Sequence, residues 1–374
     1  MSTAGSRRVT RLGRARRRDR RIMVAASAVA VLALGAGAVH GATASPPPPN
    51  VQTHALTAGD TVTLGFAGDT MLDDRIAGVI AEHGIAEVLA GVTPFLQESD
   101  FALINAEAPI TDRPAYSGKR FEYSVPPSTL PGLVDAGVDA LGLANNHTMD
   151  AGPEGLEDTI AHAADAGLIT AGAGATEVEA ERPLVLTAEA RTVGIVLLSE
   201  YYGRSSRATE DHPGVISFTE ERIQRGHDLA RAAGADDVIA YVHWGDNYGP
   251  VSDQQRFWAE KLAAAGYDLV IGSGSHSAQP VAHVDGVPIV WGLGNFVFGS
   301  RGRYEEFDAL PYGLFAQVTW HPDGSRHLDI TCLVTDNVIV DYRTRACDDA
   351  ERADLLTHLG GGLTPTERGG RLIF

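Results

Sequence analysis

Short apolar runs alternate with segments of helical periodicity along most of this chain. The apolar runs predict buried strands at 61–69, 101–107, 138–145, 236–245 and 268–274. Segments with helical spacing predict helices within 74–97 and at 127–137, 153–167, 219–234 and 252–266. Paired strand signals lie at 183–199, and 280–342 is mostly strand-like. This order predicts an α/β fold, and the strand-rich second half favours a four-layer αββα sandwich of two mixed sheets between outer helices.

The first 44 residues follow a different pattern. Nine arginines within residues 1–21 precede an apolar run at 22–39 and the small residues ATA at 42–44. That order is typical of an export signal, but 18 apolar residues are also long enough for an uncleaved membrane anchor. We therefore expect an extracytoplasmic protein, secreted or anchored in the cell membrane, with cleavage left open. A proline-rich linker (45–60), a folded domain (61–345) and a C-terminal tail (346–374) complete the predicted organisation.

The distribution of charge argues against a nucleic-acid partner. Nine of the 30 basic residues and one of the 48 acidic residues lie in the first 21 positions. The remainder carries 21 basic and 47 acidic residues, so its net charge is −26, which repels a polyanion such as nucleic acid.

The two cysteines, Cys332 and Cys347, leave one structural question open. A disulfide is permitted outside the cytoplasm, and a bridge between these residues would tie a terminal strand to the tail. The alternative is two unconnected small apolar residues. Two cysteines are too few for a thiolate metal cluster.

Polar side chains recur where the predicted strands end. Because ligands of α/β sheets collect at the carboxyl ends of strands, these side chains are expected to converge. They are Asp69, Asn105, Glu107, Asn145, Asn146, His147, His243 and His276. Carboxylates, amide oxygens and imidazoles suit one or two divalent ions such as Mn, Zn, Fe or Mg, and such ions can activate water. Singly, each residue could instead be a helix cap, a turn residue, a salt-bridge partner or a core histidine.

Several motifs resemble those of the CapA family, which acts in capsule synthesis and poly-γ-glutamate biosynthesis. They run in order over 61–298 and read GDTML, NAEAPIT, LANNHTMDAG, GAGAT, HWGDNY, GSGSHSAQP and GLGNFVF. The resemblance implies a metallophosphatase-like fold and a role outside the cytoplasm in making, exporting or trimming an envelope polymer. The implied partners are an anionic envelope polymer or its precursor, the membrane, and other subunits of a synthesis and export complex.

The resemblance extends to calcineurin-like phosphoesterases, and it implies a role for each motif residue. Asp69 and His276 would hold one metal ion, Asn146 and His243 a second, and Glu107 would bridge them. His147 would donate a proton to the leaving group, Asp150 would orient His147, and Asn105 would contact the substrate or a ligand.

Three positions depart from the family pattern. Met71 stands where phosphoesterases commonly carry a histidine, and Ser273 and Gly274 stand where relatives carry histidines. Each metal site thereby loses a ligand, although three protein ligands and water still make a catalytic site. The losses leave a second hypothesis open, in which the protein is a non-catalytic binding or assembly subunit. A serine hydrolase has little support, because His276 takes the place of the last glycine of a G-x-S-x-G elbow.

Overall fold

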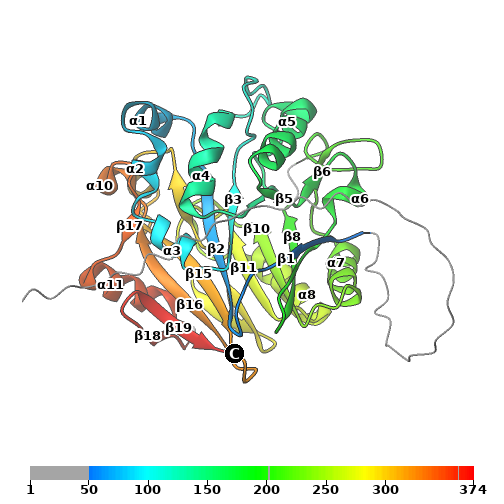
Figure 1. Cartoon of the computed structure of the whole chain (residues 1–374). Coiled ribbons are helices and arrows are strands. Elements are labelled where there is room, and N and C mark those ends of the chain that lie inside the picture. The colour runs from blue at the N-terminus through cyan, green and yellow to red at the C-terminus, as the bar shows by residue number, and fades with distance from the viewer. Residues whose placement is uncertain (1–49, 201–202, 361) are drawn as a thin grey trace, which may run out of the picture. The chain divides into compact units, whose positions relative to one another are not determined.

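Two mixed sheets form the centre of the folded part of the chain. The computed structural model describes residues 50–200, 203–360 and 362–374, which belong to a unit that begins at Ser45 (Figure 1). The seven-stranded sheet has the order β1 (Gln52–Ala55), β7 (Leu184–Thr187), β8 (Thr192–Ser199), β10 (Asp237–His243), β11 (Leu269–Ser273), β13 (Val287–Val290) and β12 (Val281–Val284).

The ten-stranded sheet combines N-terminal and C-terminal segments. Its order is β18 (Thr364–Pro365), β19 (Gly369–Ile373), β16 (Arg326–Val334), β15 (Tyr312–Trp320), β2 (Val62–Met71), β3 (Phe101–Ala106), β4 (Ala140–Gly142) and β5 (Ile169–Ala171). Two further strands join it, β14 (Asn295–Phe298) beside β2 and β17 (Arg345–Ala346) beside β16. A separate pair is formed by β6 (Ala173–Gly174) and β9 (Gly214–Val215).

Helices lie against the outer side of each sheet. Those that follow the strands of the ten-stranded sheet are α1 (Arg75–His83), α2 (Ile85–Leu89), α3 (Thr93–Gln97), a 3-10 turn η1 (Pro127–Thr129), α4 (Leu130–Ala136) and α5 (Gly152–Asp165). Beside the seven-stranded sheet lie α7 (Glu220–Ala232) and α8 (Asp253–Ala265). The remaining helices are α6 (Glu177–Ala180), α9 (Arg303–Glu306), α10 (Asn337–Val340) and α11 (Asp349–Leu359).

Three apolar clusters separate the four layers. In β10, Ile239 and Tyr241 point into the cluster between the sheets, whereas the alternate residue Ala240 points into the cluster that contains Ile223 of α7 and Leu262 of α8. A strand places successive side chains on opposite faces, so a strand buried on both faces serves two cores. A third cluster packs α1 to α5 against the other side of the ten-stranded sheet. The predicted αββα sandwich is therefore confirmed.

The helix boundaries follow local signals in the sequence. Ser252 caps α8 with a reciprocal capping box to Gln255, as expected of a serine three residues before a glutamine. Gly137 adopts a left-handed conformation (φ 105°) directly after α4. The prediction of mostly strands at 280–342 did not include the short helices α9 and α10, each of which has only four residues.

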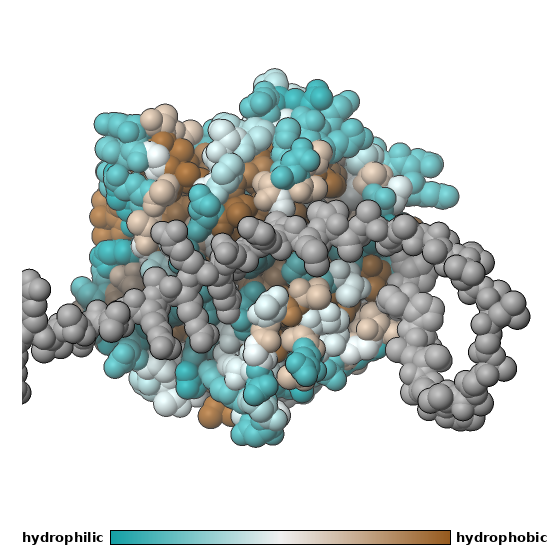
Figure 2. All heavy atoms as spheres, viewed as in Figure 1, coloured by the Kyte–Doolittle hydropathy of each residue, from teal (hydrophilic) through white to brown (hydrophobic). Residues whose placement is uncertain are grey.

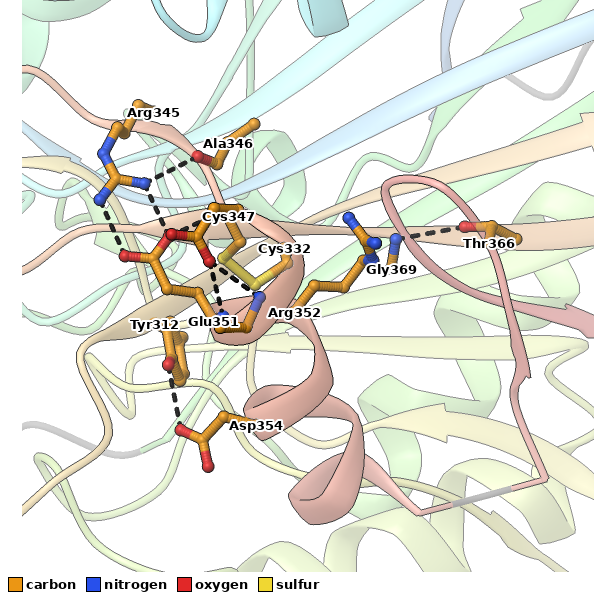
Figure 3. The surroundings of a disulfide bond; sticks show 12 residues. Tyr312, Cys332, Arg345, Ala346, Cys347, Glu351, Arg352, Asp354, Thr366 and Gly369 are labelled. Carbon is orange, nitrogen blue, oxygen red and sulfur yellow. Dashed lines mark hydrogen bonds and ion pairs between the residues drawn. A yellow bond between two sulfur atoms is a disulfide. The ribbon is translucent and has the colours of Figure 1, made fainter.

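A disulfide joins Cys332 of β16 to Cys347, which precedes α11 (Figure 3). The structure thus decides the question that the sequence left open. Beside the bridge, the Arg345 guanidinium pairs with the Glu351 carboxylate through two bonds of 2.7 and 2.8 Å. Residues after the bridge continue into α11 and β19, and β19 pairs with β16. The predicted domain boundaries themselves remain predictions.

The visible surface is mostly hydrophilic, with scattered hydrophobic residues among the polar ones (Figure 2). No helix within the described ranges is long and apolar enough to cross a membrane. The apolar run at 22–39 lies outside those ranges.

Candidate metal centre

The site lies where neighbouring parallel strands of both sheets end. In the ten-stranded sheet, β2, β3 and β4 are parallel neighbours, and Asp69 is in register with Asn105. In the seven-stranded sheet, β10 and β11 are parallel, and His243 is in register with Ser273. Because the two sheets face each other, their strand ends bring these residues together.

A β-bulge in β2 places Asp69. The pairing with β3 shifts register between Ala67 and Asp69, which leaves Gly68 without a register partner in β3. A Cβ atom at Gly68 would lie 1.9 Å from the carbonyl oxygen of Gly294, so only glycine allows this approach. The same approach lets the Asp69 N–H donate to Gly294 O at 2.9 Å.

Asp69 is fully buried and surrounded by hydrogen-bond donors. Its Oδ1 accepts from Asn105 Nδ2 at 2.8 Å, and both of its carboxylate oxygens lie 3.1 Å from the Gly274 N–H. His276 Nδ1 lies 3.2 Å from its Oδ2. Burial raises the pKa of Asp69, but His276, His243 and the Asn105 hydrogen bond together outweigh burial and lower it overall. Asp69 is therefore an anion in the metal-free protein.

Glu107 is also fully buried, but its surroundings differ. Within the described part of the chain, neither of its carboxylate oxygens has a hydrogen-bond partner. The nearest charged-group contacts of Oε1 are His276 Nε2 at 3.7 Å and His243 Nε2 at 3.8 Å. Burial, reinforced by the charge of Asp69, raises the pKa of Glu107 well above its ordinary value. Such a carboxylate is costly to bury unless a proton or a cation neutralises it.

The pKa values of the two site histidines are shifted in opposite directions. Burial lowers the pKa of His243 to about 4, so its imidazole is neutral, which is the form that binds metals. For His276, burial acts in the same direction, but the charges of Glu107 and Asp69 raise its pKa to about 9. A metal ion would have to displace the His276 proton in order to use both ring and carboxylates.

His147 and Asp150 form a buried pair beside this group. His147 Nδ1 lies 2.6 Å from Asp150 Oδ2, which also accepts from the Tyr123 N–H at 3.0 Å. Burial lowers the pKa of His147 despite the adjacent carboxylate. Burial raises the pKa of Asp150, but His147 and Lys119 together lower it. The pair holds a neutral imidazole whose Nδ1 faces the carboxylate.

The turn that carries His147 is built by Asn145. The Oδ1 of Asn145 accepts from the N–H groups of His147 and Thr148, both at 3.0 Å, and its Nδ2 donates to Asn105 Oδ1 at 3.0 Å. Asn145 thus holds the loop, as an asparagine in a turn commonly does. The neighbouring Asn146 differs, because its buried Oδ1 has no hydrogen-bond partner among the described residues.

The predicted site residues therefore come together. Asp69, Glu107 and His243 each offer one ligand atom, and these atoms lie within 4.8 Å of one another. Because neither Glu107 oxygen has a hydrogen-bond partner among the described residues, this buried group fits a divalent metal ion. Asn105 lies between Asp69 and His243, with its Nδ2 3.0 Å from His243 Nδ1. The metal and catalytic roles of the eight predicted residues remain predictions.

The three departures from the family pattern have structural counterparts. The Met71 sulfur accepts from the Asp73 N–H at 3.2 Å within the apolar core. Ser273 Oγ donates to Val242 O at 3.2 Å. Gly274 has φ 97°, and a Cβ there would lie 2.9 Å from Trp244 O, so the backbone has closed around the missing side chain.

Sequence reasoning missed two residues at the site. Lys119 donates to the Asn146 carbonyl oxygen at 2.5 Å and pairs with Asp150. The one feature of the sequence that could have drawn attention to Lys119 is the rarity of lysine, because the chain has two lysines and 28 arginines. Asn295 bonds to His276 at 2.9 Å between Oδ1 and Nδ1. It belongs to the GLGNFVF motif, which carried the family resemblance without a role for any one residue.

Fold and site together define an αββα sandwich with a buried carboxylate–imidazole group at its strand ends. The chain belongs to the bacterial capsule synthesis protein PGA_cap family, whose model matches residues 63–300. The family resemblance noted in the sequence is thereby confirmed.

Curated relatives include the PGA biosynthesis protein CapA of Bacillus subtilis, with 28% identity over 67% of this chain and 66% of that protein. The capsule biosynthesis protein CapA of Bacillus anthracis is 27% identical over 73% of this chain and 67% of that protein. A probable polyglutamine synthesis accessory protein of Mycobacterium tuberculosis is 32% identical over 59% of this chain and 62% of that protein. The chain thus spans about two thirds of the length of these relatives.

Similar solved structures include two nucleotidases. The NAD nucleotidase NadN of Haemophilus influenzae has a TM-score of 0.41 and 12% identity, over 82% of this chain and 57% of the other. A putative 5′-nucleotidase of Staphylococcus aureus has a TM-score of 0.45 and 12% identity, over 78% and 57%.

Proposed function

We propose that this protein is an exported accessory protein in the biosynthesis of poly-γ-glutamate or a related anionic envelope polymer. We further propose that its buried centre is a metal-dependent hydrolase site of the phosphoesterase type. Membership of the PGA_cap family and the names of the curated relatives support the first part. The geometry of the strand ends supports the second.

One observation carries the hydrolase proposal. The carboxylate of Glu107 is fully buried, has no hydrogen-bond partner among the described residues, and lies beside the anionic Asp69. Two buried ionised carboxyl groups repel each other, and the single His276 imidazole beside both offsets only part of their charge, so the group suits a metal cation. A fold whose purpose was stability alone would gain from an apolar residue at position 107.

Five side chains would hold one or two divalent ions: Asp69, Glu107, Asn146, His243 and His276. An ion bound there would polarise the substrate and activate water as a nucleophile. Asn105 keeps Asp69 and His243 in place by contacting both. The Gly274 N–H donates to the Asp69 carboxylate and compensates part of its charge.

His147 would protonate the leaving group. Asp150 holds its Nδ1, which leaves Nε2 as the ring nitrogen available to a substrate. The Lys119 ammonium pairs with the other carboxylate oxygen of Asp150 and lies one-third exposed. It therefore ties the loop at 112–124 to the catalytic pair. Replacing Lys119 by methionine is expected to slow hydrolysis while leaving Mn²⁺ affinity unchanged.

Export is supported by the N-terminal pattern and by the disulfide. A basic segment followed by an apolar run is typical of an export signal or an anchor. Disulfides persist in oxidising compartments, and the structure has one between Cys332 and Cys347. Fusing residues 1–60 to a reporter that is active only outside the cytoplasm tests this part. Reporter activity only inside the cell would refute it.

The hydrolase proposal is tested on purified full-length protein. Metal analysis is expected to find bound Mn, Zn, Fe or Mg, and added Mn²⁺ or Zn²⁺ is expected to support hydrolysis of phosphoesters or of poly-γ-glutamate. The variant His147→Ala should lose hydrolysis but keep its metal. Absence of bound metal together with absence of hydrolysis would sink the proposal.

The second candidate function is that of a non-catalytic binding or assembly subunit. The structural closure around Gly274 and the apolar packing of Met71 favour it, because both remove ligand positions. The variants His147→Ala and Glu107→Ala separate the two functions in cells. Unchanged polymer output would favour binding, and lost output with the fold intact would favour catalysis.

A further inference from the structure

Asn295 stands directly beside the metal centre in the ten-stranded sheet. It opens β14, which pairs in parallel with β2, and its register partner is Asp69. Its side chain is 3% exposed, so its amide must find hydrogen-bond partners within the protein.

Asn295 holds His276 at two points. The Oδ1 of Asn295 lies 2.9 Å from the ring Nδ1 of His276. The main-chain N–H of Asn295 donates to the carbonyl oxygen of His276 at 3.3 Å. Both the ring and the backbone of the histidine are therefore fixed by one residue on a neighbouring strand.

The orientation of the Asn295 amide is set by two tyrosines. Its Nδ2 donates to Tyr248 Oη at 3.4 Å and to Tyr304 Oη at 3.3 Å. The Tyr304 hydroxyl in turn donates to the carbonyl oxygen of His276 at 2.9 Å. With both amide hydrogens directed at the tyrosines, the Oδ1 atom must face the histidine.

This arrangement fixes the tautomer of His276. An amide oxygen only accepts hydrogen bonds, so the Nδ1 atom that faces it carries a proton. The Asp69 Oδ2 atom, 3.2 Å from the same nitrogen, acts in the same sense. In the neutral ring the lone pair is then on Nε2, which lies 3.7 Å from Glu107 Oε1.

The backbone of His276 also needs support. Its φ is 57°, in the left-handed region, which is strained for a residue other than glycine. The two hydrogen bonds to its carbonyl oxygen, from Asn295 and Tyr304, hold this conformation.

We propose that Asn295 is the positioning residue of the metal centre, which fixes the ring of His276 so that Nε2 is presented toward Glu107. The inference rests on the proposed function, because it assumes that His276 is a ligand. Groups that orient a ligand histidine usually contribute 10- to 100-fold to metal affinity.

The test is the affinity of the chelator-treated full-length protein for Mn²⁺ alone and Zn²⁺ alone, measured by calorimetry. Asn295→Ala is expected to weaken binding by about 10- to 100-fold. Asn295→Asp keeps an acceptor oxygen against Nδ1 and is expected to retain most of the affinity. If Asn295 acts through His276, then Asn295→Ala should add little in a His276→Ala background, because residues in one network are non-additive.

Asn337 provides the matched control. It is also a buried asparagine, and its amide donates to Phe298 O at 2.6 Å and to Ser300 O at 2.5 Å without contacting the histidine. Asn337→Ala is expected to lower stability and to leave metal affinity unchanged. Should Asn295→Ala fail to fold, Asn295→Ser leaves a smaller cavity and takes its place.

Three outcomes would overturn the inference. Wild-type affinity in a folded Asn295→Ala variant, with affinity lost in His276→Ala, would refute the positioning role and leave the metal centre standing. Equal losses in the Asn295 and Asn337 variants would show a general effect of lost packing. Unchanged affinity in His276→Ala would refute the ligand role of His276 and with it the positioning role of Asn295, whereas a wild type that binds neither Mn²⁺ nor Zn²⁺ would refute the proposed metal centre itself.

Discussion

Replacing Glu107 by glutamine removes a buried ionisable group and keeps the shape of the side chain. Since neither carboxylate oxygen has a hydrogen-bond partner among the described residues, the substitution breaks no hydrogen bond. Without a bound cation, Glu107 must either stay ionised in a buried position beside Asp69 or take up a proton. Its raised pKa, caused first by burial and then by the Asp69 charge, favours the proton, and the neighbouring His276 charge opposes it only in part.

The cost of that proton can be worked out at pH 7.5. The unfolded chain ionises near the ordinary value of 4.5, so keeping Glu107 protonated costs at most about 4 kcal/mol, at about 1.4 kcal/mol for each pH unit. The new amide brings an unpaired donor that costs about 1–3 kcal/mol. For a donor penalty of about 2 kcal/mol, the net gain from Glu107→Gln is therefore at most about 2 kcal/mol. For a unit of about 330 residues with an unfolding entropy on the order of 0.7 kcal/mol/K, this raises Tm by about 3 °C.

Added metal is expected to make wild type more stable than the Glu107→Gln variant, which reverses their order in chelator. Wild type at a Mn²⁺ concentration of about 100 times Kd gains about 2.7 kcal/mol, or about 4 °C, whereas the variant gains little. Thermal unfolding with chelator and with Mn²⁺ or Zn²⁺ measures both effects. Glu157→Gln on the exposed side of α5 is the control and should change neither. The reasoning would be refuted if neither ion raised the Tm of wild type and if Glu107→Gln were no more stable than wild type in chelator.

Three further predictions follow from the disulfide, from His243 and from Gly274. Replacing both Cys332 and Cys347 by alanine opens a 15-residue loop and should cost about 3 kcal/mol, or about 4 °C in Tm; an unchanged Tm would contradict this. Because burial lowers the pKa of His243 to about 4, the unfolded chain protonates first as the pH falls from 6.5. The free energy of unfolding in chelator should therefore decrease by up to about 3 kcal/mol between pH 6.5 and 4, and urea titrations of wild type and His243→Gln should differ in this slope. Gly274→His restores the residue of the relatives, but φ 97° and the contact with Trp244 O should cost about 1–3 kcal/mol without tightening Mn²⁺ binding; tighter binding would show that the loop can reopen.

Much of the fold was readable from the sequence. The apolar runs that predicted strands at 61–69 and 236–245 correspond to β2 and β10, and alternation of helix and strand signals predicted the layering. These signals are local, since periodicity, capping residues and glycines act within a few positions. Short helices such as α9 lie below the length at which periodicity shows.

The site was predictable as a set of residues but not as a geometry. Polar residues at strand ends were visible, and parallel pairing of neighbouring strands makes their convergence expected. The hydrogen bonds between Asn145 and Asn105, and between Lys119 and Asp150, join residues 40 and 31 positions apart, and no local pattern predicts such contacts.

The sequence by itself determined the layered α/β architecture, the acidic body with a basic N-terminus, the identity of the candidate ligands and the family. Only the tertiary structure decided that Cys332 and Cys347 are bridged, that the Glu107 carboxylate has no hydrogen-bond partner among the described residues, and that Asn295 holds His276. The reason is physical. Propensity and periodicity are properties of neighbouring residues, whereas burial, pKa shifts and unsatisfied hydrogen bonds depend on which distant strands pack together.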